Sequence, residues 1–107
     1  MSNDDPLEKV IERKVCKVAS ERGILTYKFT SPARALVPDR LFLAPIPDFL
    51  QPIIAEYVRF VEFKRAGKKP TAIQAREHDR LRALGFTVDV VDSVTDGNEV
   101  VIGMLGG

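Results

Sequence analysis

Four polar residues in this chain have types and spacing that could bind a divalent metal ion and act on a phosphate ester. Asp39 follows a proline, Glu62 and Lys64 flank Phe63 in an apolar run, and Gln74 begins a later helical segment. Side chains alternate along a strand, so Glu62 and Lys64 share one face. Burying charged groups there is costly unless something pairs with them. A divalent cation held by Asp39 and Glu62, with Lys64 beside the reacting group, would offset that cost.

This chemistry is the hydrolysis of a phosphodiester. The reaction needs a metal ion to polarise the phosphate and a cation to stabilise the charge that develops. Carboxylates are hard oxygen ligands that suit Mg²⁺ or Mn²⁺, and the backbone carbonyl of Phe63 could supply a further oxygen. Lys64 is expected to remain protonated and to orient the water or stabilise the phosphate. The alternative interpretation is a salt bridge between Glu62 and Lys64 on a half-exposed sheet.

Gln74 is placed by helical periodicity. On a helix over 72–84, positions 74, 78, 81 and 85 form one stripe. Leu81 is a core residue, so Gln74 and His78 are expected to face the sheet. A buried glutamine needs partners, and its place in the first turn predicts a phosphate or a ligand carboxylate nearby. His78 is interpreted as a satisfied, half-buried histidine rather than a ligand.

The first helix offers two acidic residues, Glu8 and Glu12, which lie four apart and therefore on one face. Either could reach the metal ion or its outer-shell water. The alternative is an ordinary surface role, with Arg13, Lys14 or Lys17 close enough to pair with one of them.

Basic residues surround the predicted site, although the net charge of the chain is only +1. Residues 59–82 hold eight Lys and Arg against three acidic residues, a net charge of +5, whereas residues 86–107 hold four acidic residues and no Lys or Arg. This distribution suits a phosphate-backbone ligand, and its alternative is a solvated helix face. The candidate phosphate contacts are Lys28, Arg34, Arg40, Lys68, Lys69 and Arg76.

Helices and strands must position these residues, and their predicted order is α-β-β-β-α-β, a compact α/β core. Thr71 is a predicted N-cap, and Gly23 and Gly85 are predicted to end helices. The run 57–63 is nearly continuous in apolar residues, which predicts a central strand. The predicted elements are a helix from Pro6 to Gly23, strands over 24–29, 40–44, 57–63 and 86–91, a helical turn near 48–50, a helix over 72–84, and a strand or helix over 93–104.

Composition fits one ordinary domain over residues 1–107. Hydrophobic residues make up 45% of the chain and charged residues 29%, which is typical of a folded protein. No apolar stretch is long enough to span a membrane, and the sequence shows no signal peptide. Cys16 is the single cysteine, so we expect no intramolecular disulfide. Together these features predict a cytoplasmic location and no membrane partner.

Taken together, these motifs resemble the VRR-NUC domain, the virus-type replication-repair nuclease branch of the PD-(D/E)xK superfamily. The match runs from about Glu8 to Ser93, and a short chain of this kind is similar to the stand-alone phage-type members. The residues that carry the resemblance are Lys28-Phe29, Ser31-Pro32, Val37-Pro38-Asp39-Arg40, Val61-Glu62-Phe63-Lys64, Gly67-Lys68-Lys69-Pro70-Thr71, Gln74 and Leu81-x-x-Leu84-Gly85-Phe86.

The resemblance implies a restriction-endonuclease-like core, with a central mixed sheet flanked by helices. It also implies Mg²⁺- or Mn²⁺-dependent, structure-selective cleavage of branched DNA by a homodimer similar to Holliday-junction resolvases. Asp39 and Glu62 would be metal ligands, Lys64 the catalytic lysine and Gln74 the helix glutamine of the family. The N-terminal acidic residue of the family falls on Glu12 or Glu8, and we prefer Glu12.

Two alternatives keep the fold and change the function. One is a non-catalytic DNA-binding module, and the other is a monomeric nuclease directed at flaps or ends. Between Asp39 and Glu62 the chain carries a proline-rich insertion, Pro45 to Tyr57. Its apolar residues could cover the core or form a dimer surface.

Overall fold

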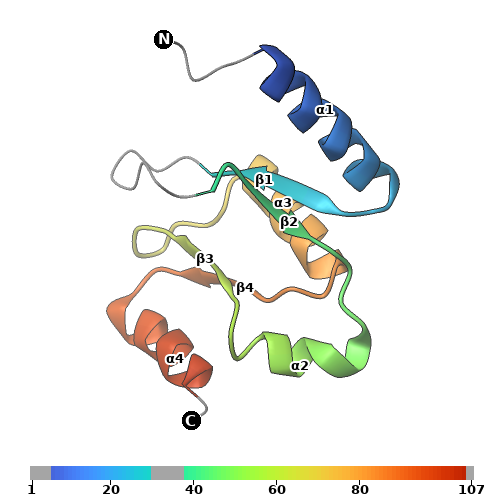
Figure 1. The fold of residues 1–107 in the computed structure, drawn as a ribbon. Helices are drawn as coiled ribbons and strands as arrows, with labels where there is room; N and C mark the ends of the chain where they lie inside the picture. Colours follow the sequence, from blue (N-terminus) through green and yellow to red (C-terminus); the bar gives the residue numbers. More distant parts are fainter. Residues whose placement is uncertain (1–5, 30–37, 106–107) are drawn as a thin grey trace. The chain divides into compact units, whose positions relative to one another are not determined.

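The computed structural model describes residues 6–29 and 38–105. Its chain divides into two compact units, Met1–Pro45 and Ile46–Gly107, and each is described by itself. The first unit contains α1 (Pro6–Glu21), β1 (Leu25–Lys28) and β2 (Arg40–Leu43). The second contains the 3₁₀ turn η1 (Asp48–Leu50), α2 (Gln51–Ile54), β3 (Phe60–Phe63), α3 (Ala72–Ala83), β4 (Val88–Val91) and α4 (Val94–Met104) (Figure 1).

In the first unit, α1 leads directly into an antiparallel ladder. Gly23 adopts a φ of 74°, and the Ile24 amide donates to the Ala19 carbonyl at 2.9 Å, which closes the helix as the glycine predicts. β1 and β2 pair with Leu25 opposite Leu43 and Lys28 opposite Arg40. The two strands and the end of α1 are therefore confirmed, while most of the predicted loop over 31–38 lies outside the described residues.

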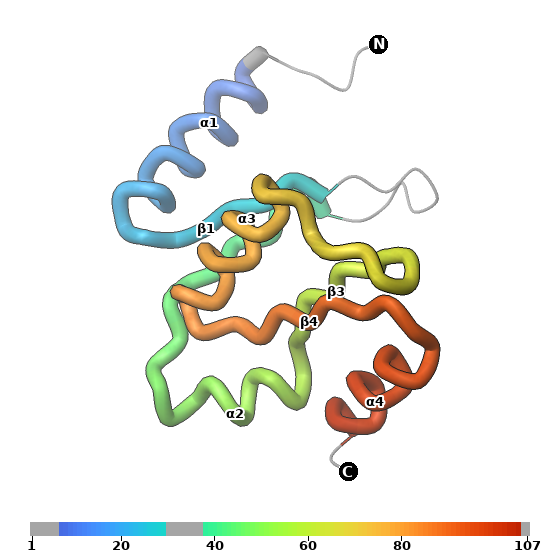
Figure 2. Tube along the Cα trace, turned by 180° about the vertical axis from the view of Figure 1, so that it is seen from behind, coloured from blue at the N-terminus to red at the C-terminus, as the bar shows by residue number. Residues whose placement is uncertain are grey.

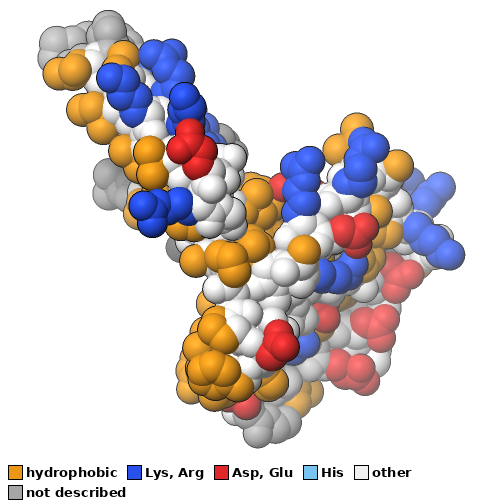
Figure 3. Space-filling view, turned by 90° about the vertical axis from the view of Figure 1, so that its right-hand side faces the viewer, with side chains coloured by type: hydrophobic (Ala, Val, Ile, Leu, Met, Phe, Trp, Pro, Cys, Tyr) orange, Lys and Arg blue, Asp and Glu red, His pale blue; other side chains and the backbone are white. Residues whose placement is uncertain are grey.

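One face of α1 stays open to solvent although its sequence is apolar. Ala19 is buried, whereas Val15 and Val18 are 47% and 52% exposed. Figure 3 shows hydrophobic side chains along α1 with Lys and Arg beside them. A shallow groove of about 380 Å³ runs between Val15, Val18 and Phe42 of β2. The predicted helix is confirmed, but much of its apolar stripe is not core.

In the second unit, β3 and β4 form a parallel ladder between two helices. Phe60 pairs with Val88 and Glu62 with Val90. The Glu62 side chain contacts His78 of α3, whereas a Cβ built on Gly97 of α4 would lie 3.3 Å from the Val91 side chain. Side chains at positions 62 and 91 point to opposite faces of the ladder, because residue 62 pairs with 90. α3 and α4 therefore cover opposite faces, as Figure 2 shows.

Both ends of α3 are closed by the residues that the sequence predicts. The Thr71 hydroxyl accepts from the Gln74 amide at 3.2 Å, and the Gln74 side-chain oxygen accepts from the Thr71 amide at 3.0 Å. This is a capping box. At the other end Gly85 has a φ of 101°, and the Phe86 amide donates to the Leu81 carbonyl at 3.1 Å. The bond from the Phe86 amide to the Leu81 carbonyl is the one that spans the helix end in a Schellman motif.

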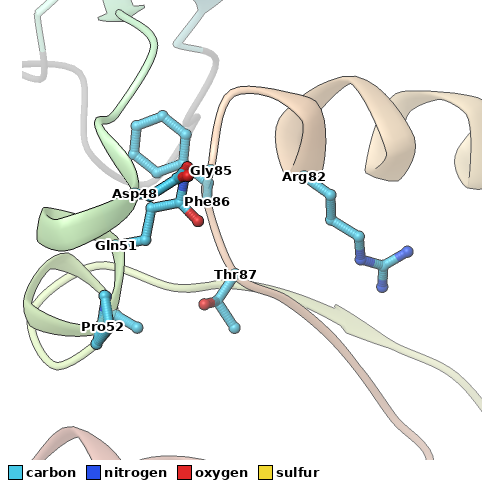
Figure 4. Close-up of a pocket in the computed structure, with 8 residues that line it drawn as sticks. Asp48, Gln51, Pro52, Arg82, Gly85, Phe86 and Thr87 are labelled. Carbon is cyan, nitrogen blue, oxygen red and sulfur yellow. The ribbon is translucent and has the colours of Figure 1, made fainter.

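The insertion after β2 forms a turn and a short helix. The predicted turn over 48–50 is confirmed as η1, and the chain continues into α2. Gln51 donates to the Ile46 carbonyl at 3.0 Å and to the Asp48 carboxylate at 3.3 Å. Its side chain also packs against Gly85, and the close-up in Figure 4 shows both beside a cavity of about 310 Å³.

Two sequence predictions about the strands need correction. The strand expected over 57–63 begins at Phe60, because Tyr57 and Val58 donate to the Ile54 carbonyl at 2.9 and 2.8 Å and so extend the helical turn. The strand expected from Phe86 begins at Val88, because Phe86 closes α3. The segment 93–104, left open between strand and helix, is α4.

The expected single central sheet is also not what the structure shows. The four strands among residues 6–29 and 38–105 form two sheets of two strands each, antiparallel in the first unit and parallel in the second. β3 therefore pairs with β4 and is an edge of its own ladder rather than a central strand. The mixed α/β class is confirmed, and the restriction-endonuclease-like core stays a prediction. In the part of the chain that the structure describes, no helix is long and apolar enough to cross a membrane.

Candidate metal and phosphate site

Glu62 lies near the end of β3 and points toward α3. Its Oε1 lies 3.3 Å from Nε2 of His78, whose side chain is only 9% exposed. The Glu62 side chain itself is 29% exposed. Its second oxygen, Oε2, accepts no hydrogen bond from a described residue. One carboxylate oxygen therefore has a protein partner, and the other has no hydrogen-bond partner among the described residues.

Lys64 follows β3 directly, and its side chain is half-buried. The Lys64 amide donates to the Val91 carbonyl at 2.9 Å, so the backbone is fixed at this point. No carboxylate among residues 6–29 and 38–105 forms a salt bridge with Lys64. The alternative of a Glu62–Lys64 salt bridge is wrong, because the described residues form no such pair and the partner of Glu62 is His78.

The Phe63 carbonyl is available for the role that the sequence predicts. The amides of Phe60 and Lys64 both point to β4, at 3.0 and 2.9 Å from their acceptors. Backbone groups alternate along a strand, so those of Phe63 point to the other edge. The Phe63 ring is 73% exposed. It shares the α4 face with Val91 in a cavity of about 490 Å³ that Lys64 also borders.

Gln74 has a different local environment from the one predicted. Its side chain is half-buried rather than buried, and its oxygen is occupied by the Thr71 amide in the capping box. The geometry gives this glutamine a structural partner in its own helix. Its role toward a phosphate or a metal ligand stays a prediction.

The first unit holds Asp39 and the acidic residues of α1. Asp39 is exposed immediately before β2, and its carbonyl accepts from the Phe29 amide at 3.0 Å. Glu12 Oε2 lies 2.8 Å from Nε of Arg40, with both side chains 30% exposed. The Arg40 hydrogen bond lowers the pKa of Glu12, and the same bond raises the pKa of Arg40. Glu8 is exposed one turn earlier.

The predicted phosphate contacts are mostly at the surface of their units. Arg40 already has an acidic partner in Glu12. Arg34 lies outside the described residues. The turn after Lys64 is tied down, because the Gly67 amide donates to the Asp92 carboxylate at 3.0 Å. The exposed cationic candidates that remain are Lys28, Lys68, Lys69 and Arg76.

The donor set of the second unit fits a small hard cation. Glu62 Oε2 and the Phe63 carbonyl are both oxygen donors at the end of β3, and Mg²⁺ commonly takes only one or two carboxylates while keeping several waters. Within either unit, the described residues form no group of three or more His, Cys, Asp or Glu that could hold a metal ion. The choice of Mg²⁺ or Mn²⁺ stays a prediction.

Sequence reasoning missed the contact between His78 and Glu62. His78 was placed on the stripe that faces the sheet, and its burial confirms that placement. The spacing along α3 does not say which strand residue lies opposite. The signal that could have found the pair is the presence of two polar residues, one on each of two elements expected to pack together.

An α/β chain with a Glu-x-Lys pair at the end of a strand has the side chains that phosphate-ester chemistry uses. The chain is 43% identical over 90 residues to a protein of Acyrthosiphon pisum secondary endosymbiont phage 1 named "Putative nuclease p44". The match covers 84% of this chain and 83% of that protein, so the chain belongs to the same family as this phage protein. No protein-family model and no solved structure matches the chain. The resemblance to the VRR-NUC domain therefore stays a prediction.

Proposed function

We propose that the protein is a nuclease that hydrolyses phosphodiester bonds in DNA with the help of Mg²⁺ or Mn²⁺. The observation that carries the proposal is the Glu62–Phe63–Lys64 segment. Glu62 is partly exposed there, and Lys64 has no salt-bridge partner among the described residues. Strand alternation predicts that the two side chains share one face. Kinship with a phage protein named as a nuclease supports the same conclusion.

Glu62 Oε2 and the Phe63 carbonyl would hold the cation in the second unit. Asp39 would supply a second carboxylate from the first unit, a part of the proposal that rests on the sequence pattern. When bound, the cation polarises the phosphodiester and lowers the pKa of the attacking water.

Lys64 would stabilise the reaction through its charge. The water oxygen attacks phosphorus, the bond from phosphorus to the leaving sugar oxygen breaks, and negative charge grows on the phosphate oxygens. The ammonium group of Lys64 offsets that charge and can orient the water. The proton lost by the water passes to solvent, and the leaving oxygen gains one from it.

The basic surface supports a nucleic-acid substrate. Segment 59–82 has a net charge of +5, and Lys68, Lys69 and Arg76 are exposed within it. Such a surface attracts the phosphate backbone without reading sequence. We further propose that branched DNA is the preferred substrate and that a homodimer presents two sites to a junction. The additional proposed phosphate contacts are Lys28, Arg34 and Arg40. Glu12 and Gln74 complete the proposed site. The proposed location is the cytoplasm of a phage or bacterial host.

The test is cleavage of end-labelled DNA by the purified protein. Four-way junction, flap and linear duplex are each incubated with Mg²⁺, Mn²⁺ or EDTA, beside the variant Lys64→Ala. We expect metal-dependent cuts in the junction and a loss of about 100-fold or more in rate for the variant, with its far-UV circular dichroism unchanged.

Other outcomes separate the alternatives. Cuts at flaps or ends by a monomer would replace the junction proposal, with subunit state measured by light scattering. Salt-sensitive DNA binding without cuts in either metal would indicate a non-catalytic module. Full activity of Lys64→Ala would overturn the mechanism.

A further inference from the structure

We propose that His78 is a positioning residue for Glu62. Its Nε2–H would donate to Glu62 Oε1 and so direct Oε2 toward the metal ion. The inference rests on the proposed function, because it assumes that Glu62 is a metal ligand. It adds a residue that sequence reasoning excluded from the site.

The first observation is the contact itself. Nε2 of His78 lies 3.3 Å from Glu62 Oε1, across the gap between α3 and β3. A carboxylate that is rotationally free must lose that freedom when it binds an ion, and a fixed one has already lost it. Partners that orient ligand side chains commonly change metal affinity by about 10- to 100-fold.

The second observation is the burial of the imidazole. The His78 side chain is 9% exposed, the lowest exposure in any described salt bridge or histidine contact. A polar ring in that position requires a hydrogen-bond partner, and Glu62 supplies it. Because the ring is packed in place, it holds the carboxylate in one orientation.

The third observation is that hydrogen bonds close both ends of the helix that carries the ring. The capping box at Thr71 and the Schellman motif at Gly85 fix both ends of α3. His78 lies between these two ends, on the same helical stripe as the buried residue Leu81. A residue that positions a ligand must itself be held, and these two ends hold it.

The experiment measures metal binding by the full-length protein without DNA. Mn²⁺ is titrated into the wild type and four variants, and free Mn²⁺ is followed by electron paramagnetic resonance. The variants are Glu62→Gln, His78→Leu, His78→Gln and Asp79→Asn. Asp79 is the matched control, an exposed α3 residue whose nearest described cation is Arg82 at 3.8 Å.

We expect His78→Leu to weaken Mn²⁺ binding by about 10- to 100-fold. His78→Gln should restore most of the affinity, because its amide nitrogen can reach the place of Nε2. Asp79→Asn should bind as the wild type does. In cleavage assays His78→Leu should need more metal while keeping its rate at saturating metal, which a merely structural role would not produce.

Several outcomes overturn the inference. If His78→Leu is folded and binds Mn²⁺ like the wild type, His78 positions nothing. If His78→Leu does not fold, we compare His78→Gln with His78→Asn, whose shorter amide cannot reach the position of Nε2. Tighter Mn²⁺ binding by His78→Gln would support positioning. Equal Mn²⁺ affinities of the two variants would reject it. If Glu62→Gln binds Mn²⁺ as tightly as the wild type does, Glu62 is not a metal ligand. That result would refute the proposed function rather than the role of His78 alone.

Discussion

Two carboxylates that the sequence predicts for one metal site have different partners in the two units. Glu12 of the first unit faces the guanidinium of Arg40 at 2.8 Å, whereas Glu62 of the second faces the imidazole of His78 at 3.3 Å. Arg40 carries a permanent positive charge that would compete with a metal ion for Glu12. An imidazole with its proton on Nε2 would donate one hydrogen bond to Glu62, which is the role that we propose for His78.

The difference teaches that an acidic residue at the right spacing is not sufficient evidence for a metal ligand. The carboxylate of Glu12 is already neutralised by its partner, and Arg40 lowers its pKa. That of Glu62 contacts His78 and forms no salt bridge with a Lys or Arg among the described residues. Glu62 is therefore the stronger candidate for a direct metal ligand, and the ion pair with Arg40 makes Glu12 the weaker one within the proposed site.

The largest expected effect compares Glu62→Gln with Glu12→Gln. We expect Glu62→Gln to lower the cleavage rate by more than about 100-fold, beyond the loss typical of an outer partner. Glu12→Gln should lower it far less. Initial rates at saturating Mg²⁺ make the measurement, with circular dichroism as the control for folding. Equal losses would break the comparison and return Glu12 to the metal site.

The next effect concerns the anchoring of α3. Gly85→Ala places a methyl group in a left-handed backbone and 2.6 Å from Nε2 of Gln51. Gly67→Ala has the same backbone problem, with φ of 78° and no atom within 4 Å. The left-handed conformation costs about 1–2 kcal/mol in each variant. Gly85→Ala should lose about 1 kcal/mol more because Gln51 must move and weaken its bond to Ile46. Urea unfolding measures both, and an equal loss would show that Gln51 adapts freely.

A smaller effect tests Gln74. Replacing it by alanine removes half of the capping box and should cost about 1 kcal/mol of stability. Glutamate can form the same box, so Gln74→Glu should keep the free energy of unfolding near that of the wild type. Cleavage by the glutamate variant then decides between roles. A normal rate indicates a cap alone, whereas a stable variant with a much lower rate would place Gln74 at the site.

The smallest effect is the acid sensitivity of the Glu12 pair. The pKa of Glu12 is below its usual value of 4.5 in the folded protein. Its stabilising contribution is therefore complete above that value and is lost as the pH falls through the lower folded pKa. The stability difference between the wild type and Glu12→Gln should shrink as the pH falls below about 4.5. Thermal melts across pH 3–7 measure it, and a pH-independent difference would exclude the ion pair as its source.

The parts of the fold predicted correctly are those fixed by local chemistry. Gly23, Thr71 and Gly85 close helices through bonds to residues a few positions away, so their roles follow from sequence. The start of β3 did not follow, because the apolar run over 57–63 suits a helical turn and a strand equally well. Tyr57 joined the turn through its bond to Ile54.

The candidate site was predicted in its residue types and only partly in its geometry. Strand alternation placed Glu62 and Lys64 on one face, and the helical stripe turned His78 toward the sheet. The pairing of Glu62 with His78 depends on how α3 settles on the ladder, which tertiary packing decides. For Gln74 a local interaction decided the outcome instead. Helical periodicity predicts that its side chain faces the sheet, but its oxygen accepts a hydrogen bond from the Thr71 amide.

The double closure of α3 also has a consequence for amide hydrogen exchange. A helix with open ends exchanges its protons first at the termini, by fraying. In α3 the amides of Gln74 and Phe86 are bonded in the motifs that close each end. We therefore expect exchange within the helix to depend on opening of the larger segment, so the amide of His78 would report the stability of the surface that holds Glu62.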